Sequence, residues 1–209
     1  DKEKTYEFLV EHGFDTPQIF TYSRARKGPF PLFMKPRHGS SAKDIHFLRS
    51  RSALEFYRRS SGENVIQEFI SGEEFTIDVF ADSSGKARCA VPRKRLEVRG
   101  GEVSKSLTVR HEEIIAQSMR LVDELKGCFG AITIQCFLTP EGQIKFIEIN
   151  PRFGGGIPLA FRAGANYPKW LLQMQLGREP DFDAGVWQDG LFMLRYDESI
   201  FKTQDEVQG

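Results

Sequence analysis

The chain of 209 residues lacks the features that mark several classes of protein. No apolar run approaches the length of a membrane span, and the N-terminus carries no signal-peptide pattern, so we expect no membrane partner. The formal net charge is zero, which argues against binding nucleic acid by phosphate neutralisation. The three cysteines are odd in number and lack zinc-ligand spacing, so we expect reduced thiols in a cytoplasmic protein.

Several common nucleotide and catalytic motifs are also missing. No Gly-Lys-Ser/Thr opens a helix and no G-x-G-x-x-G follows a strand, so neither a P-loop nor a dinucleotide fingerprint is indicated. The four histidines are scattered along the chain, and no Ser-His-Asp or Cys-His pairing is visible. The chemistry must therefore be sought in other residue types.

The chain does have the composition and patterning of an ordinary folded domain. It is 40% hydrophobic and 28% charged, and its length allows one substantial domain or two small lobes. The order of helix and strand patterns, without βαβ alternation, predicts an α+β fold with mainly antiparallel sheet. Periodicity predicts helices over 2–12, 52–59, 112–126 and 168–176, and strands over 31–36, 64–70, 75–81, 86–95, 103–109, 131–138 and 143–150.

The strongest chemical signal lies at the end of the last strand pair. A turn over 139–142 predicts a hairpin in which 138 pairs with 143 and Gln135 pairs with Phe146. Glu148 and Asn150 would then share a face with Gln135. Two amide oxygens and one carboxylate suit Mg²⁺, or Mn²⁺, that arrives with phosphates, which Arg152 would neutralise. The alternative is a polar strand end with a solvated Arg152.

A second signal lies around residue 35. Lys35 stands in an apolar strand and can hold a phosphate as a point charge, although it also fits an edge-strand lysine that discourages aggregation. The loop 37–43 that follows, with Gly39, Ser40 and Ser41, can cradle phosphates through backbone N–H groups, or form a plain surface turn.

A third signal is the strand–turn–strand segment 65–77. Backbone groups of Glu68, Phe69 and Ile70 can read an adenine edge, and Glu74 can accept hydrogen bonds from ribose hydroxyls. The alternative is a surface hairpin with exposed glutamates.

Taken in order, these segments and the tail Asn150–Leu159 with Ala163–Pro168 resemble the ATP-grasp superfamily, most closely its carbamoyl-phosphate-synthetase-like branch. The resemblance runs from residue 1 to about residue 177. It implies two α+β lobes that hold ATP between antiparallel sheets: a small lobe over about 18–70, and a large lobe over about 71–196 with the 1–13 helix. A Rossmann-like lobe that precedes this region in the family is absent from the chain.

The resemblance also implies roles for individual residues. Phosphate contacts fall on Lys2, Lys35 and the flap Gly39-Ser40-Ser41. Adenine contacts fall on Gln67 and the hinge at Glu68, Phe69 and Ile70, and the ribose contact falls on Glu74. The metal ligands fall on Gln135, Glu148 and Asn150. Arg152 falls on the transferring phosphate. The resemblance also implies a third basic residue that faces the phosphates, either Lys94 or Arg95. We take Arg95 as a catalytic candidate, together with Arg152 and Lys35.

The implied activity is an ATP- and Mg²⁺-dependent ligase that activates a small carboxylate as an acyl phosphate for attack by an amine or ammonia. Three alternatives stay open: an ATP-grasp kinase, a non-catalytic nucleotide-binding module of a larger protein, and a structural domain with chance motifs. A homodimer and a preceding lobe of the same protein are the open options for protein partners.

Overall fold

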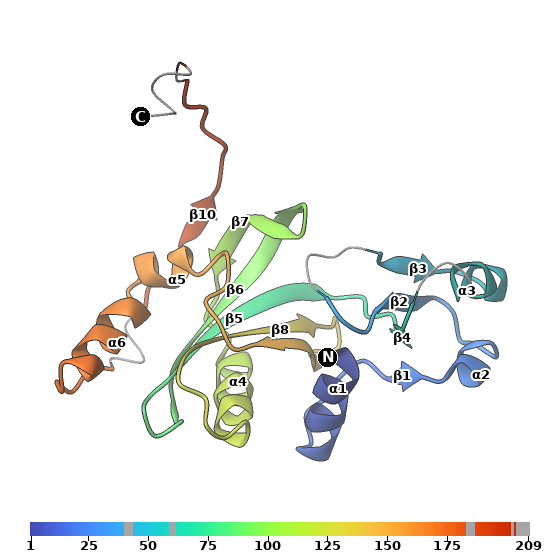
Figure 1. Ribbon diagram of the computed structural model, residues 1–209, viewed down its shortest axis with the longest axis horizontal. Helices are drawn as coiled ribbons and strands as arrows, with labels where there is room; N and C mark the ends of the chain where they lie inside the picture. Colours follow the sequence, from blue (N-terminus) through green and yellow to red (C-terminus); the bar gives the residue numbers. More distant parts are fainter. Residues whose placement is uncertain (40–43, 59–61, 183–186, 202, 204–209) are drawn as a thin grey trace.

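The computed structural model describes residues 1–39, 44–58, 62–182, 187–201 and 203. Two antiparallel sheets dominate it, a small sheet of four strands and a large sheet of six. Figure 1 shows them side by side, with the N-terminal helix α1 (Lys2–Glu11) at their junction. The α+β class predicted from the sequence is confirmed. No helix among the described residues is long and apolar enough to cross a membrane.

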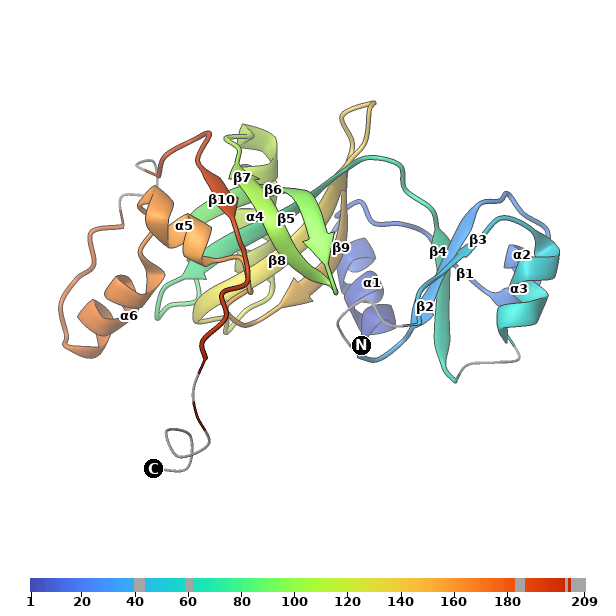
Figure 2. The ribbon, with the colours of Figure 1, turned by 90° about the horizontal axis from the view of Figure 1, so that it is seen from above.

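The small sheet has the strand order β1-β4-β2-β3. Its core is apolar and lies under two short helices, with Leu32, Met34, Leu48 and Leu54 at 2% exposure or less. Figure 2 shows both helices on the side of this sheet that faces away from the large sheet. The elements are β1 (Ile19–Phe20), α2 (Tyr22–Ala25), β2 (Leu32–Pro36), β3 (His46–Leu48), α3 (Arg51–Arg58) and β4 (Asn64–Glu68).

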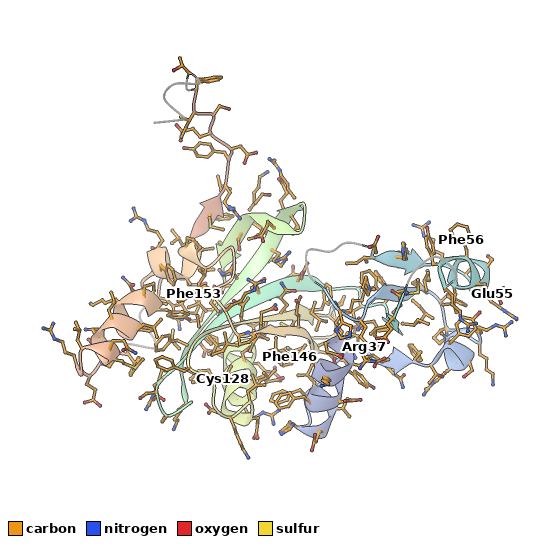
Figure 3. The ribbon with its side chains drawn as sticks, in the orientation of Figure 1. Arg37, Glu55, Phe56, Cys128, Phe146 and Phe153 are labelled. Atoms are coloured by element: carbon orange, nitrogen blue, oxygen red, sulfur yellow. The ribbon has the colours of Figure 1, made fainter. Side chains whose placement is uncertain are left out.

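The large sheet has the strand order β10-β7-β6-β5-β8-β9. Its strands are β5 (Glu73–Ala81), β6 (Ala87–Arg99), β7 (Glu102–Thr108), β8 (Gly130–Leu138), β9 (Ile144–Asn150) and β10 (Phe192–Leu194). One face packs against α1 and α4 (Glu112–Glu124), and this contact buries Ile77, Leu121, Ile134 and Phe146 completely. Figure 3 labels Phe146 on that side of the sheet.

The opposite face of the large sheet is divided into two halves. Helices α5 (Pro158–Ala163) and α6 (Tyr167–Gln175) cover one half, where Phe80, Cys89 and Val91 pack against Tyr167 and Trp170. The other half is polar and faces the small sheet. The division occurs along single strands. On β5, residues two positions apart share this face, and they change from the polar Glu74, Thr76 and Asp78 to the apolar Phe80.

The β8–β9 hairpin corrects the predicted register. Leu138 pairs with Ile144 and Cys136 with Phe146, because Gln143 lies in the loop rather than in the ladder. A bulge then makes Ile147 an extra residue, so that Gln135 pairs directly with Glu148. Phe146 points into the core, so the predicted pairing of Gln135 with Phe146, which would have placed Phe146 and Glu148 on one face, was wrong. The bulge brings Glu148 onto the same face as Gln135. Without it, alternation from the buried Phe146 would place Glu148 on the core side of the sheet.

The remaining differences from the sequence expectations concern short elements. Five pieces of two to six residues (β1, α2, β3, α5 and β10) were not predicted. Segments this short contain too few residues to show a helical or strand period. The longer helices and strands were predicted to within a few residues at most of their ends.

Candidate nucleotide-binding site

A cleft of about 640 Å³ lies between the polar half of the large sheet and the inner edge of the small sheet. Thirteen of the residues singled out from the sequence line it, while Ser40 and Ser41 lie outside the described residues. The thirteen come from both sheets and from the start of α1: Lys2, Lys35, Gly39, Gln67, Glu68, Phe69, Ile70, Glu74, Arg95, Gln135, Glu148, Asn150 and Arg152. Residues up to 150 positions apart in the chain therefore meet in one space.

Two lysines meet at one side of the cleft. Lys2 lies in the first turn of α1, and its Nζ donates to the carbonyl oxygen of Gly39 at 3.0 Å. Lys35 comes from β2 and is largely buried, which lowers its pKa to about 8, with further lowering from Lys2 and an opposing effect of Glu148. The two ammonium groups repel each other, and among the described residues neither forms an ion pair with a carboxylate, so together they favour a bound anion.

The N-terminal helix is fixed to the small sheet by Arg37. This side chain donates from Nε to Asp1 at 3.0 Å and forms an ion pair with Glu3 at 2.8 Å. Figure 3 shows Arg37 at the junction of α1 and the small sheet. Because Asp1 also accepts hydrogen bonds from the first N–H groups of α1, the position of Lys2 depends on this junction.

Glu74 and Arg95 form a pair on the floor of the cleft. Arg95 Nε lies 3.0 Å from Glu74 Oε1, and its Nη1 donates to Thr76 at 3.3 Å. Burial raises the pKa of Glu74, and the Arg95 guanidinium opposes that rise. Of the two bases considered, Arg95 points into the cleft, while Lys94 pairs with Glu73 on the other face of β6. Both the ribose role of Glu74 and the phosphate role of Arg95 stay predictions.

Apolar walls and one buried amide form the end of the cleft beside β4. Phe33, Phe69, Phe137 and Ile147 are apolar residues of the cleft lining, and Phe33 lies opposite Gln67 on the β2–β4 ladder. Gln67 is 6% exposed, and its Oε1 has no hydrogen-bond partner among the described residues. A buried acceptor without a donor is costly, so this position fits a ligand with an exocyclic amino group, such as adenine.

The oxygen donors meet on the β8–β9 ladder. Gln135 pairs directly with Glu148, and Asn150 lies opposite Thr133, with all four lining the cleft. The described residues contain no group of three or more His, Cys, Asp and Glu that would hold a metal. Two amides with one carboxylate fit a hard cation whose remaining ligands are phosphate oxygens.

Arg152 follows immediately in the turn after β9. Thr133 donates from its hydroxyl to the Arg152 carbonyl at 2.9 Å, and Arg152 Nη1 donates to the Phe153 carbonyl at 3.1 Å. These bonds fix the turn while its guanidinium remains exposed to the cleft. Figure 3 shows Phe153 near α5, and its ring lies 6.1 Å from that of Phe161.

The sequence reading missed Arg93 and Thr133, which lie two residues before Arg95 and Gln135. Strand alternation from those two candidates would have placed both on the cleft face. Arg93 is 1% exposed and holds the completely buried Asp78 through two hydrogen bonds, from Nε at 2.5 Å and from Nη2 at 3.1 Å. A buried ion pair with bidentate geometry is costly to break, so it fixes the centre of the sheet face.

Three glycines close the inner end of the cleft. A Cβ on Gly154 would lie 2.9 Å from Thr133 Oγ1, one on Gly155 would lie 2.2 Å from Glu102 Oε2, and one on Gly156 would lie 2.3 Å from Arg93 Nη1. The run Gly154-Gly155-Gly156 therefore follows from close backbone approach to the sheet.

Comparison with known protein families matches residues 1–156 to the family described as "ATP-grasp domain". The chain is 22% identical over 159 residues to a D-alanine–D-alanine ligase of Fusobacterium nucleatum, covering 72% of this chain and 55% of that protein. It is 24% identical over 213 residues to a carbamoyl phosphate synthase large chain of Caldanaerobacter subterraneus, covering 90% of this chain and 20% of that protein. The chain thus spans about half of the first relative and a fifth of the second.

Solved structures show the same fold. The biotin carboxylase domain of the 2-oxoglutarate carboxylase of Hydrogenobacter thermophilus, solved with MgADP and bicarbonate, superposes with a TM-score of 0.76 at 17% identity. The match covers 92% of this chain and 48% of that one.

Proposed function

The chain belongs to the ATP-grasp family, and on that premise we propose that it is the catalytic region of an ATP- and Mg²⁺-dependent ligase. The reaction activates a carboxylate as an acyl phosphate, which an amine or ammonia then attacks, as in carbamoyl-phosphate synthetases. The observation that carries the proposal is the convergence of four cationic side chains and three oxygen donors on one cleft: Lys2, Lys35, Arg95, Arg152, Gln135, Glu148 and Asn150.

The nucleotide is proposed to lie along the cleft. Its adenine occupies the space between Phe33, Phe137 and Ile147, with the amino group donating to Gln67 Oε1. Glu74 accepts from the ribose hydroxyls, and Lys2 and Lys35 neutralise the phosphates. Phosphoryl transfer depends mainly on positioning and charge neutralisation, which these residues provide without a protein nucleophile.

Mg²⁺ held by Gln135, Glu148 and Asn150 would neutralise charge on the phosphate oxygens. Arg152 orients the γ-phosphate, and its turn is fixed by Thr133. A carboxylate oxygen of the substrate attacks the γ-phosphorus, and the bond to the bridging oxygen breaks as ADP leaves. The amine nitrogen then attacks the acyl carbon, inorganic phosphate leaves, and the amine proton passes to solvent.

We also propose that the two sheets act as the two lobes, about 18–70 and about 71–196 with the 1–13 helix. The same proposal gives the chain a small carboxylate and an amine or ammonia as substrates. Its proposed protein partners are a preceding lobe of the same protein and a second copy in a homodimer. The related carboxylase's solved dimer and bound bicarbonate are properties of that protein.

Two measurements test the proposed function. Mg²⁺ with ATP should raise the melting temperature of the chain, whereas Mg²⁺ alone should bind weakly, because the protein ligands carry one formal negative charge. If an acyl phosphate forms, added hydroxylamine should attack its acyl carbon, giving a hydroxamate as inorganic phosphate is released. A phosphorylated alcohol would instead support the kinase alternative, and absence of any nucleotide effect would contradict nucleotide binding itself.

A further inference from the structure

Thr133 lies in the polar half of the large sheet, between a buried carboxylate and a proposed metal ligand. On the strand ladders it pairs with Asp78 of β5 on one side and with Asn150 of β9 on the other. Residues that pair directly across antiparallel strands share a face, so these three side chains form a row on the side of the sheet that carries the cleft. Thr133 itself is 4% exposed and lines the cleft.

The Thr133 hydroxyl has one proton and two acceptors within reach. It donates to the main-chain carbonyl of Arg152 at 2.9 Å. The second acceptor is the Asp78 carboxylate, where a hydrogen bond from Thr133 opposes the rise in pKa that burial causes. Arg93 already donates to both oxygens of Asp78, at 2.5 Å to Oδ2 and at 3.1 Å to Oδ1. Because these charge-assisted bonds are stronger than a bond from a neutral hydroxyl, they leave the Thr133 proton for the Arg152 carbonyl.

The glycine run that follows Arg152 rests on the same group of side chains. A Cβ on Gly154 would lie 2.9 Å from Thr133 Oγ1 and 3.5 Å from Asp78 Oδ1. One on Gly156 would lie 2.3 Å from an Nη1 atom of the sheet, that of Arg93. The backbone of this loop therefore lies directly on the polar row, and a side chain at either glycine would displace it.

The Arg152 turn has few other attachments. Its N–H donates to the Asn150 carbonyl at 2.8 Å, and its Nη1 donates to the Phe153 carbonyl at 3.1 Å, both within the turn itself. Among the described residues Arg152 forms no ion pair. The bond from Thr133 is therefore the contact through which a residue distant in sequence holds this turn against the sheet.

We propose that Thr133 is a positioning residue for phosphoryl transfer, whose hydroxyl holds the Arg152 turn so that the guanidinium meets the γ-phosphate. The buried pair of Asp78 and Arg93 supports this role, because it leaves the hydroxyl free to bond the turn. The inference rests on the proposed function and adds a residue that acts through Arg152. Phosphoryl transfer depends on positioning, and a displacement of about 1 Å can lower turnover on the order of 10²-fold.

The test compares the binding of ADP and of a non-hydrolysable ATP analogue, each with Mg²⁺, by calorimetry on the whole chain. The two ligands differ by the γ-phosphate, so the ratio of their dissociation constants reports the contact that Arg152 makes. Thr133→Val removes the hydroxyl and keeps the shape, whereas Thr133→Ser keeps the hydroxyl. Gly154→Ala is an independent variant that keeps the hydroxyl and displaces the turn from it.

Thr139→Val is the matched control. Thr139 is 8% exposed in the turn of the same hairpin, and its hydroxyl also takes part in a hydrogen bond, accepting from the Gln143 N–H at 3.2 Å. Urea denaturation should show similar losses of stability for the two valine variants. A difference in nucleotide binding between them then reports position in the site.

Arg152→Ala should lower the preference for the ATP analogue about ten- to a hundredfold, the effect of a hydrogen bond to a charged group. Thr133→Val should lower it about fivefold, the effect of one neutral hydrogen bond, with ADP affinity unchanged. Gly154→Ala should lower it similarly. Thr133→Ser and Thr139→Val should both keep the preference of the unsubstituted chain.

The inference and the proposed function fail in different ways. A loss of preference in Arg152→Ala with none in Thr133→Val or Gly154→Ala would overturn the inference alone. A serine variant that behaves like the valine variant would also overturn it, because the hydroxyl would then not hold the turn. An unchanged preference in Arg152→Ala would refute the proposed role of Arg152, and the inference with it.

Discussion

The two halves of one face of the large sheet differ although they lie on the same strands. Under α5 and α6, Phe80 and Cys89 are buried among aromatic rings. A few residues along the same strands, Glu74 and Arg95 face the cleft. The Asp78–Arg93 pair lies between the halves, and Tyr167 donates to the Asp78 carbonyl at 2.8 Å across that boundary.

The difference shows how one sheet supports both stability and chemistry. The apolar half gains free energy from burial and needs no ligand. The polar half carries charged side chains that are buried or half-buried, and burial raises the pKa of Glu74 there. Across the cleft, on β2 of the small sheet, burial lowers the pKa of Lys35 to about 8. Such groups are retained where they act on a ligand. Substitutions in the two halves should therefore separate stability from activity.

The largest effect should come from the apolar half, in Phe80→Ala. Phe80 is fully buried, with ring centroids 5.2 Å from Tyr167 and 5.3 Å from Trp170. The cavity should lower the free energy of unfolding by about 3–5 kcal/mol, as measured by urea denaturation. Phe56→Ala, at a ring that is 68% exposed on α3, is the control. Similar losses in both variants would contradict the difference in burial.

In the polar half, Glu148→Gln should have the opposite profile. The change keeps the shape but removes the one carboxylate among the proposed metal ligands, so turnover should fall on the order of 10²-fold or more. Nucleotide affinity should change only a few-fold, and the free energy of unfolding should change little. Glu141→Gln, in the exposed turn of the same hairpin, is the control. Full turnover in Glu148→Gln would contradict the metal assignment.

A smaller effect is expected at Asp82, in the β5–β6 turn away from both halves. Burial favours a higher pKa, but hydrogen bonds from Ser84, Arg88 and Lys86 outweigh it and lower the pKa to about 2. The ionised form therefore stabilises the fold above pH 4, and this contribution disappears as the pH falls toward 2.

Asp82→Asn should lower the free energy of unfolding by about 1–2 kcal/mol at pH 7, and the difference from the unsubstituted chain should shrink between pH 4 and 2. Urea denaturation over a pH series measures it, with the exposed Asp181→Asn as control. A difference that stays constant down to pH 2 would show that the carboxylate charge contributes nothing.

The smallest effect concerns Lys35, whose pKa of about 8 lies below its ordinary value. Between pH 8 and 10.5 the folded chain binds fewer protons than the unfolded chain, so its stability without nucleotide should rise with pH. Affinity for Mg²⁺-ATP should instead fall a few-fold from pH 8 to 9, because the ammonium loses its proton. Lys35→Arg keeps its charge and should remove the fall. A flat affinity profile in the unsubstituted chain would contradict a phosphate contact by Lys35.

Much of this organisation could be predicted from the sequence. Helix periodicity located α1, α4 and α6, and strand patterns with turn residues located the long strands. The candidate residues were also predicted to share a site, and those that the structure describes line one cleft. Their individual roles stay predictions until the substitutions are made.

Other features depended on contacts that the sequence does not display. The bulge at Ile147 follows from the five-residue loop 139–143 and the burial of Phe146, and it alone turns Glu148 toward Gln135. Arg93 resembles any strand arginine until Asp78 is placed beside it. The close approach of Glu102 to Gly155 joins residues 53 positions apart, so no local sequence pattern indicates it.

The sequence by itself determined the α+β class, the main elements and the kinds of side chain available, because these depend on local patterns of apolar, polar and turn residues. Tertiary structure decided which half of the sheet face is covered and which is open, since α5 and α6 pack over one half and the small sheet lies opposite the other. That choice depends on long-range packing of complementary surfaces, and no local pattern encodes it.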